Sequence, residues 1–196
     1  MTTCDKAYPG TNHQRLLVQT PSYLLVFDTL DSNTERCFEW LYHNRGSDAS
    51  CDTVTKPMKF SDPFPGSEYI ANTRKGITDN IIRIQFKDKG ITTYLTMAAE
   101  PQTEVLVGDG PGASTADRVP LTMISRHGKK VRFAAVLEPV RDDQLATVTN
   151  VQIMDSDDTA LIKVSQGDMT DTILVDGKDN VQVRRDDKVM LQPAQR

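Results

Sequence analysis

The sequence lacks any long apolar run. Its 196 residues are 38% hydrophobic, and no stretch approaches the roughly 18 consecutive apolar residues that a membrane-spanning helix needs. The first ten residues, MTTCDKAYPG, contain neither the basic segment nor the apolar segment of a secretory signal. We therefore expect no spanning helix, no signal in this chain and no membrane partner.

Cysteine is scarce, and so is excess positive charge. The three cysteines, Cys4, Cys37 and Cys51, form no C-x-x-C pair, which disfavours a zinc knot or a dense disulfide scaffold. The formal net charge is -4, whereas nucleic-acid binding depends on a domain-wide basic field that releases counterions. We expect no nucleic-acid partner, and the same charge disfavours strong independent binding of a polyanionic glycan.

Helical periodicity is also absent, because no stretch sustains apolar side chains at a period of about 3.6. The sequence instead shows strand patterns. Residues 35–44 alternate with a period of two, so that Phe38 and Trp40 share one face. Residues 23–30 are almost continuously apolar and stop at the turn formers Asp31, Ser32 and Asn33. These runs predict separate antiparallel strands joined by a turn.

Later segments extend the same pattern. Alternating runs predict one hairpin over 81–86 and 91–97, and another over 121–126 and 130–138 that turns at His127 and Gly128. Short, evenly spaced runs, typical of sandwiches and barrels, follow at 144–154, 160–165, 169–175, 181–185 and 188–191. The predicted fold is all-β, an antiparallel β-sandwich of two or more stacked sheets with little helix. It forms one domain over 1–196, with sheet layers at about 1–140 and 141–196.

An ordered set of segments carries a resemblance to a known family. The set consists of Tyr8-Pro9-Gly10, His13 with Arg15, LLVFD at 24–28, EWLYHNRG at 39–46, LVGDGPG at 106–112 and RHGKKVRFAAVLEP at 126–139. It resembles the C-terminal β-rich part of the heparinase II/III-like polysaccharide lyases. Members of that family share a Tyr-x-Gly pattern, a nearby basic residue, an apolar strand ending in Asp and a Trp strand closing in His.

The resemblance implies a parent enzyme that cleaves acidic, uronic acid-containing polysaccharide by β-elimination. In the family this chemistry is carried mainly by an N-terminal helical toroid, which this sequence does not contain. The chain has no His-x-His segment, and His13, His43 and His127 match no catalytic position of the family. We therefore expect no catalytic residue, no metal ligand and no cofactor.

The expected role is that of a non-catalytic fragment that supports the toroid and lines part of the substrate cleft. Its expected partners are the missing N-terminal domain of the same enzyme and acidic polysaccharide, and the parent is expected to be periplasmic or secreted. Two alternatives stay open: an autonomous carbohydrate-binding module, and a complete small lyase built only of strands.

One candidate contact surface is the end of the strand that contains Trp40. Tyr42, His43, Asn44 and Arg45 lie there, and segments at strand ends often carry function. Trp40 and Tyr42 together would offer an aromatic platform to a sugar ring, although a lone Trp alternating with Phe38 is more typical of a core. We expect this strand end to contact a glycan or the missing domain.

The second candidate is the densest basic cluster, which contains Arg126, Lys129 and Lys130. Guanidinium and ammonium groups bind carboxylates and sulfates, but a charged run at a turn is also typical of a simple solvated tip. The acidic run at 155–158 lacks the spacing of an EF-hand loop, so we expect a plain turn there rather than a calcium site.

Overall fold

The computed structural model describes residues 1–4, 8–54, 56–60, 66–114, 116–156, 159–176 and 180–191. Antiparallel strands make up most of these ranges, in two sheets that pack against each other, which confirms the predicted all-β sandwich. The helical content of the described part is one turn of 3-10 helix, η1 (Ser67–Tyr69). Within these ranges no helix has the length and apolar character needed to cross a bilayer.

Ten strands form the first sheet and five form the second. The first sheet contains β1 (Thr2–Cys4), β2 (Thr11–Gln19), β3 (Leu24–His43), β4 (Asp48–Ser50), β5 (Lys56–Pro57), β6 (Ala71–Thr78), β7 (Ile82–Asp88), β8 (Ile91–Met97), β9 (Thr103–Pro111) and β10 (Arg118–Arg141). The second contains β11 (Val148–Ser156), β12 (Thr159–Gln166), β13 (Met169–Asp176), β14 (Val181–Arg185) and β15 (Lys188–Leu191). The five short strands predicted near the C-terminus are thus all present, and so is the β7–β8 hairpin.

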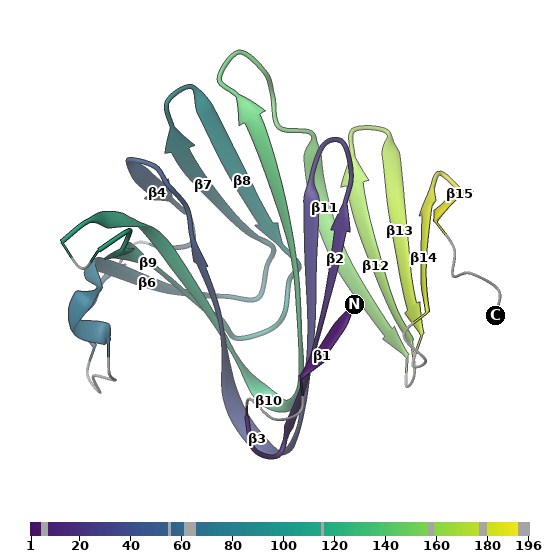
Figure 1. Cartoon of the computed structure of the whole chain (residues 1–196), viewed down its shortest axis with the longest axis horizontal. Coiled ribbons are helices and arrows are strands. Elements are labelled where there is room, and N and C mark those ends of the chain that lie inside the picture. The colour runs from purple at the N-terminus through teal and green to yellow at the C-terminus, as the bar shows by residue number, and fades with distance from the viewer. Residues whose placement is uncertain are drawn as a thin grey trace.

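Two long strands form the spine of the first sheet. β3 has 20 residues and β10 has 24, and they pair with each other along most of their length. Both bend at the same level, where Gly128 pairs with Arg36, Lys130 pairs with Asp31 and the register shifts between the two pairs. Gly128 has a φ of 155°, a conformation that a residue with a side chain rarely adopts. Figure 1 shows β3 and β10 turning together at this bend.

The sequence predicted chain reversals at this level, and that prediction was wrong. Asp31-Ser32-Asn33 and His127-Gly128 were read as turns that separate strands, whereas β3 and β10 each continue through them. The physical reason is that the two segments lie opposite each other, so that each half-strand pairs with the other long strand. Turn-forming residues in paired strands produce a bulge and a bend. Here they bend β3 and β10 together, so that the sheet changes direction at this level.

The bend divides the first sheet into two wings. β10 pairs with β9 before the bend and with β8 after it. The first wing contains β5, β6 and β9 with the end of β3 and the start of β10, and the second wing contains the other strands with the remaining halves of β3 and β10. Phe38 and Trp40 from the first wing pack with Ile84, Phe86 and Phe133 from the second in one buried core.

A second core lies between the opposite face of the second wing and the five-stranded sheet. Leu25 and Phe27 of β3 point into it, whereas Val26 between them points into the first core. The central strands are therefore buried on both faces, which explains why LLVF in β3 is apolar at every position instead of alternating. The chain passes to the second sheet after Arg141, next to the predicted change of layer at about residue 140.

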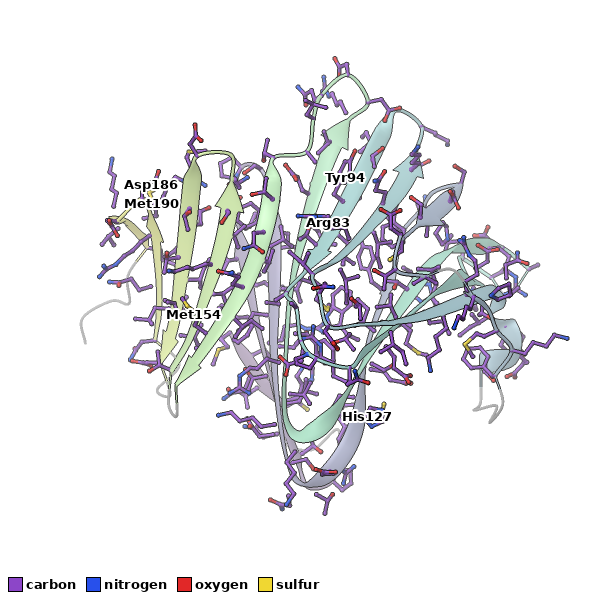
Figure 2. The ribbon with its side chains drawn as sticks, turned by 180° about the vertical axis from the view of Figure 1, so that it is seen from behind. Arg83, Tyr94, His127, Met154, Asp186 and Met190 are labelled. Atoms are coloured by element: carbon purple, nitrogen blue, oxygen red, sulfur yellow. The ribbon has the colours of Figure 1, made fainter. Side chains whose placement is uncertain are left out.

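Polar side chains tie the two sheets together beside the second core. The Tyr23 hydroxyl donates to Asp171 Oδ2 at 2.7 Å, and Arg185 donates to both oxygens of Asp171 at 2.7 and 2.8 Å. Arg83 Nη2 also donates to the Thr149 carbonyl across the two sheets, and Figure 2 labels this arginine. Asp171 is only 3% exposed, so its charge depends on these donors.

This arrangement predicts a loss of stability in acid. Burial acts to raise the pKa of the Asp171 carboxyl, but the hydrogen bonds from Arg185 and Tyr23 outweigh it and hold that pKa below the usual 3.8. The folded protein therefore binds this proton more weakly than the unfolded chain does. The stabilisation is present above the unfolded pKa and disappears as pH falls through the lower folded pKa.

We expect Asp171→Asn to lower the free energy of unfolding near neutral pH by about 2 kcal/mol. The difference from the wild-type protein should shrink as pH falls below about 4. Urea unfolding at a series of pH values measures it, with Asp168→Asn as the control because Asp168 is exposed. A difference that stays constant through the acid range would contradict the assignment.

Candidate functional site: the hollow beside Tyr42

The predicted contact segment lies where β3 ends. The backbone amide of Asn44 donates to the Pro120 carbonyl at 3.1 Å, which fixes the strand end against β10. Tyr42 and Asn44 are half-buried, whereas His43 and Arg45 are exposed. The four predicted contact residues are therefore neighbours, but they divide between two faces of the sheet.

Tyr42 packs at the open end of the first core. Its ring centroid lies 5.9 Å from that of Trp40 in a stacked arrangement and 5.3 Å from that of Phe86 in an edge-to-face arrangement. Burial raises the pKa of the Tyr42 hydroxyl, and a hydrogen bond from Asn44 Nδ2 at 2.9 Å opposes the shift only in part. The phenol is therefore neutral and held in place.

A hollow of about 550 Å³ opens beside the Tyr42 ring. It lies where the start of β3 and the end of β10 meet the connection to β11. Its apolar lining comes from Tyr42, Leu24, Leu137 and Pro139 and its polar lining from groups such as Gln19, Thr93, Gln144 and Thr147. An apolar and aromatic surface with a few polar groups suits a ligand with C–H faces and hydroxyls, such as a sugar ring.

Glu138 borders the same hollow, but its carboxylate is fully used by the fold. It is 4% exposed and accepts hydrogen bonds from the Thr147 amide at 2.8 Å, the Thr147 hydroxyl at 2.7 Å and the Val148 amide at 3.1 Å. Gln166 extends this network by donating to Thr147 Oγ1 at 3.1 Å and to Ser22 Oγ at 3.0 Å. Glu138 therefore fixes the connection between the sheets and is not placed as a free base.

The predicted basic cluster is divided by the structure. Lys129 and Lys130 are exposed and follow His127 at the bend of β10, where Figure 2 labels the histidine. Arg126 is 2% exposed and its guanidinium lies over the Phe133 ring, 4.9 Å from the centroid. The prediction that Arg126 contacts a substrate or another domain was therefore wrong, because its side chain points into the first core.

The two predicted contact surfaces also lie apart. Tyr42 pairs with Thr122 on β10, and Lys129 lies seven residues further along that strand. At about 3.3 Å per residue, the separation along the strand is about 20 Å. The structure therefore does not bring Lys129 and Lys130 to the hollow beside Tyr42.

A polar cluster around the buried carboxylate of Asp28 was not predicted from the sequence. This carboxylate is 1% exposed and lies 2.8 Å from His13 Nε2. Arg15 donates to both of its oxygens at 2.7 and 2.8 Å, and Trp40 Nε1 donates to it at 3.1 Å. An Asp that ends an apolar strand must find partners if it is buried, and the alternate basic residues His13 and Arg15 were the available signal.

The histidines do not converge on a common site. His13 belongs to the Asp28 cluster, His43 lies against Gly110, and His127 lies at the bend. In the ranges that the structure describes, no three His, Cys, Asp or Glu side chains are grouped so as to hold a metal ion. Asp157 and Asp158 of the predicted acidic turn lie outside the described residues.

Comparison with known proteins adds no identity to this geometry: no protein-family model matches the chain, and no curated protein matches it at a significant level.

Proposed function

We propose that this chain is the non-catalytic C-terminal β-sheet domain of a polysaccharide lyase that cleaves acidic, uronic acid-containing polysaccharide by β-elimination. Its role is to support a catalytic helical domain of the same enzyme and to line part of the substrate cleft. The surface that fits this role is the end of β3, where the hollow beside Tyr42 is open and Asn44 holds the tyrosine hydroxyl. The parent enzyme is proposed to act in the periplasm or outside the cell.

One observation carries the proposal. Residues from the segments that resemble the lyase family come together around one buried carboxylate: the half-buried His13, the exposed Arg15 and the buried Trp40 all contact Asp28. The Tyr-x-Gly segment is held to the same sheet, because Arg36 Nη2 on β3 donates to the Pro9 carbonyl at 2.9 Å. The resemblance thus rests on residues that hold the fold, which supports a bracing role rather than a catalytic one.

The chain alone is expected to show no lyase turnover. The buried carboxylates Asp28 and Glu138 have their oxygens engaged by donors, so neither is placed to abstract a proton from a substrate. The measurement is ultraviolet absorbance of the unsaturated uronide product with alginate, hyaluronan, chondroitin and heparan sulfate as substrates. Turnover that co-purifies with the chain would identify a complete small lyase instead.

The reading frame upstream of Met1 tests the other half of the proposal. We expect it to encode a helical toroid with a His-Gly-His segment. A stop codon directly upstream, without such a domain, would remove the parent enzyme from the proposal.

The alternative function is an autonomous carbohydrate-binding module, and the hollow beside Tyr42 is the observation in its favour. A module would bind an oligosaccharide tightly by itself in calorimetry, and Tyr42→Ala would abolish the binding. Tyr69→Ala is the matched control, because Tyr69 is an exposed tyrosine on η1, outside the lining of this hollow.

A further inference from the structure

A second hollow lies where the edges of the two wings approach each other. It has a volume of about 450 Å³ and lies between β4 of the second wing and β6 and β9 of the first. An adjoining hollow of about 530 Å³ shares Pro57, Asn72 and Thr73 with it. Together they form a groove across β6, which shares no lining residue with the hollow beside Tyr42.

The groove is centred on a distorted part of β6. The register between β6 and β9 shifts between Ala71 and Arg74, and Asn72 inside this bulge has a φ of 52°. Opposite it, a Cβ atom on Gly108 would lie 2.8 Å from the Ala71 carbonyl oxygen, so the strands approach closely only because residue 108 is glycine. Asn72 is exposed, so its positive φ, which asparagine adopts more readily than most residues, is not imposed by core packing of its side chain.

Hydrogen-bonding groups of both kinds face this groove. Asn72 Nδ2 donates to Asp109 Oδ2 at 2.6 Å, and Arg74 Nη2 donates to the Ala49 carbonyl at 3.2 Å. In the described ranges, the second oxygen of Asp109 and the carboxylate of Asp48 accept no hydrogen bond. Donors from Asn72 and Arg74 therefore lie next to acceptors from Asp48 and Asp109.

This mixture suits neighbouring hydroxyl groups better than an ion. A hydroxyl both donates and accepts, so a ring with adjacent hydroxyls uses carboxylates and amide or guanidinium donors together. In the described residues, no third His, Cys, Asp or Glu side chain joins Asp48 and Asp109 in a group that could hold a metal ion. Pro57 and Phe60 add apolar surface along the groove, which suits the C–H face of a pyranose ring.

We propose that the groove across β6 is a saccharide-binding site in which Asp48, Asn72, Arg74 and Asp109 contact ring hydroxyls. The proposal does not rest on the lyase assignment, because the ligand chemistry follows from the groove itself. The two adjoining hollows, of about 530 and 450 Å³, leave room for more than one sugar ring.

The test is a titration followed by NMR of the backbone amides. The two probes are an uncharged β-linked tetrasaccharide of glucose and a tetrasaccharide of alternating uronic acid and amino sugar. We expect millimolar probe to shift the amides of Asn72, Arg74, Gly108 and Asp109. The relative affinity of the two probes then shows whether Arg74 also binds a carboxylate.

Asn72→Gly separates the ligand contact from the fold, because glycine keeps the positive φ while the side-chain amide is lost. We expect affinity to fall about tenfold, as the loss of one well-placed hydrogen bond does, with no fall in thermal stability. Asp187→Gly is the matched control, because Asp187 also has a positive φ of 67° but lies in the β14–β15 turn. The proposal fails if neither probe shifts these amides, if the shifts centre on the Tyr42 hollow, or if Asn72→Gly binds as well as the wild type.

Discussion

Replacing Arg126 with alanine is expected to lower the free energy of unfolding by about 3–5 kcal/mol. Arg126 Nε donates to Thr103 Oγ1 at 3.1 Å, Nη2 donates to the Ala98 carbonyl at 2.6 Å, and Nη1 donates to the Arg132 carbonyl. Thr103 belongs to the first wing, and Arg132 lies on β10 beyond the bend. The alanine variant leaves these acceptors buried without a donor and creates a cavity at the fold of the sheet.

The charge of Arg126 is part of this expectation. Burial lowers the pKa of its guanidinium to about 10, and the nearby charge of Glu100 opposes the shift. The group therefore remains protonated at neutral pH. Arg126→Lys keeps the charge but loses the planar set of donors that reaches three acceptors, so it is also expected to destabilise the fold, by less than alanine does.

Urea unfolding at neutral pH measures the effect as a change in midpoint with an unchanged slope. Lys129→Ala is the matched control, because it removes an exposed cation three residues along the same strand. If the Arg126→Ala and Lys129→Ala midpoints agree within error, the bridging role of Arg126 is wrong.

Trp40→Ala is expected to have an effect of the same size, a loss of about 3–5 kcal/mol. Trp40 is 5% exposed, stacks on Tyr42 and donates to Asp28 Oδ2. Its removal leaves a large cavity between the two wings and deprives a buried carboxylate of one donor. Thermal or urea unfolding measures the loss.

Two further variants make this result specific. Trp40→Phe keeps an aromatic ring but removes the indole donor, so a loss of about 1–3 kcal/mol is expected from the Asp28 contact together with the smaller ring. Leu41→Ala is the control, because Leu41 is the next residue on the opposite face and is 52% exposed. A Trp40→Ala protein as stable as the Leu41→Ala protein would show that this ring does not support the core.

Local alternation was sufficient to predict most of the strands but not the path of the sheet. The β7–β8 hairpin and the five short strands after β10 follow directly from period-two patterns and turn residues. The continuation of β3 and β10 through their turn-forming residues could not be predicted, because it depends on two segments about a hundred residues apart lying opposite each other. Turn propensity is local, whereas bulge formation requires a partner strand.

The candidate sites show the same limit. The strand end at Tyr42 was predicted because an aromatic alternation stops there, and the structure places a hollow beside it. The burial of Arg126 was not predicted, because a run of basic residues has the same sequence whether all its side chains are exposed or one of them is buried. The groove across β6 was missed because Asp48, Asn72 and Asp109 come from three strands, and their proximity depends on the closure of the two wings.

The sharing of β3 and β10 between both cores has a consequence for how the molecule comes apart. Val26 and Phe133 contribute to one core, whereas Leu25, Phe27 and Ala134, on the same two strands, contribute to the other. Separation of this strand pair disrupts both hydrophobic cores at once. We therefore expect that neither sheet unfolds independently of the other. Denaturation should accordingly be one cooperative transition, with amide protons of the central strand pair exchanging only through global opening.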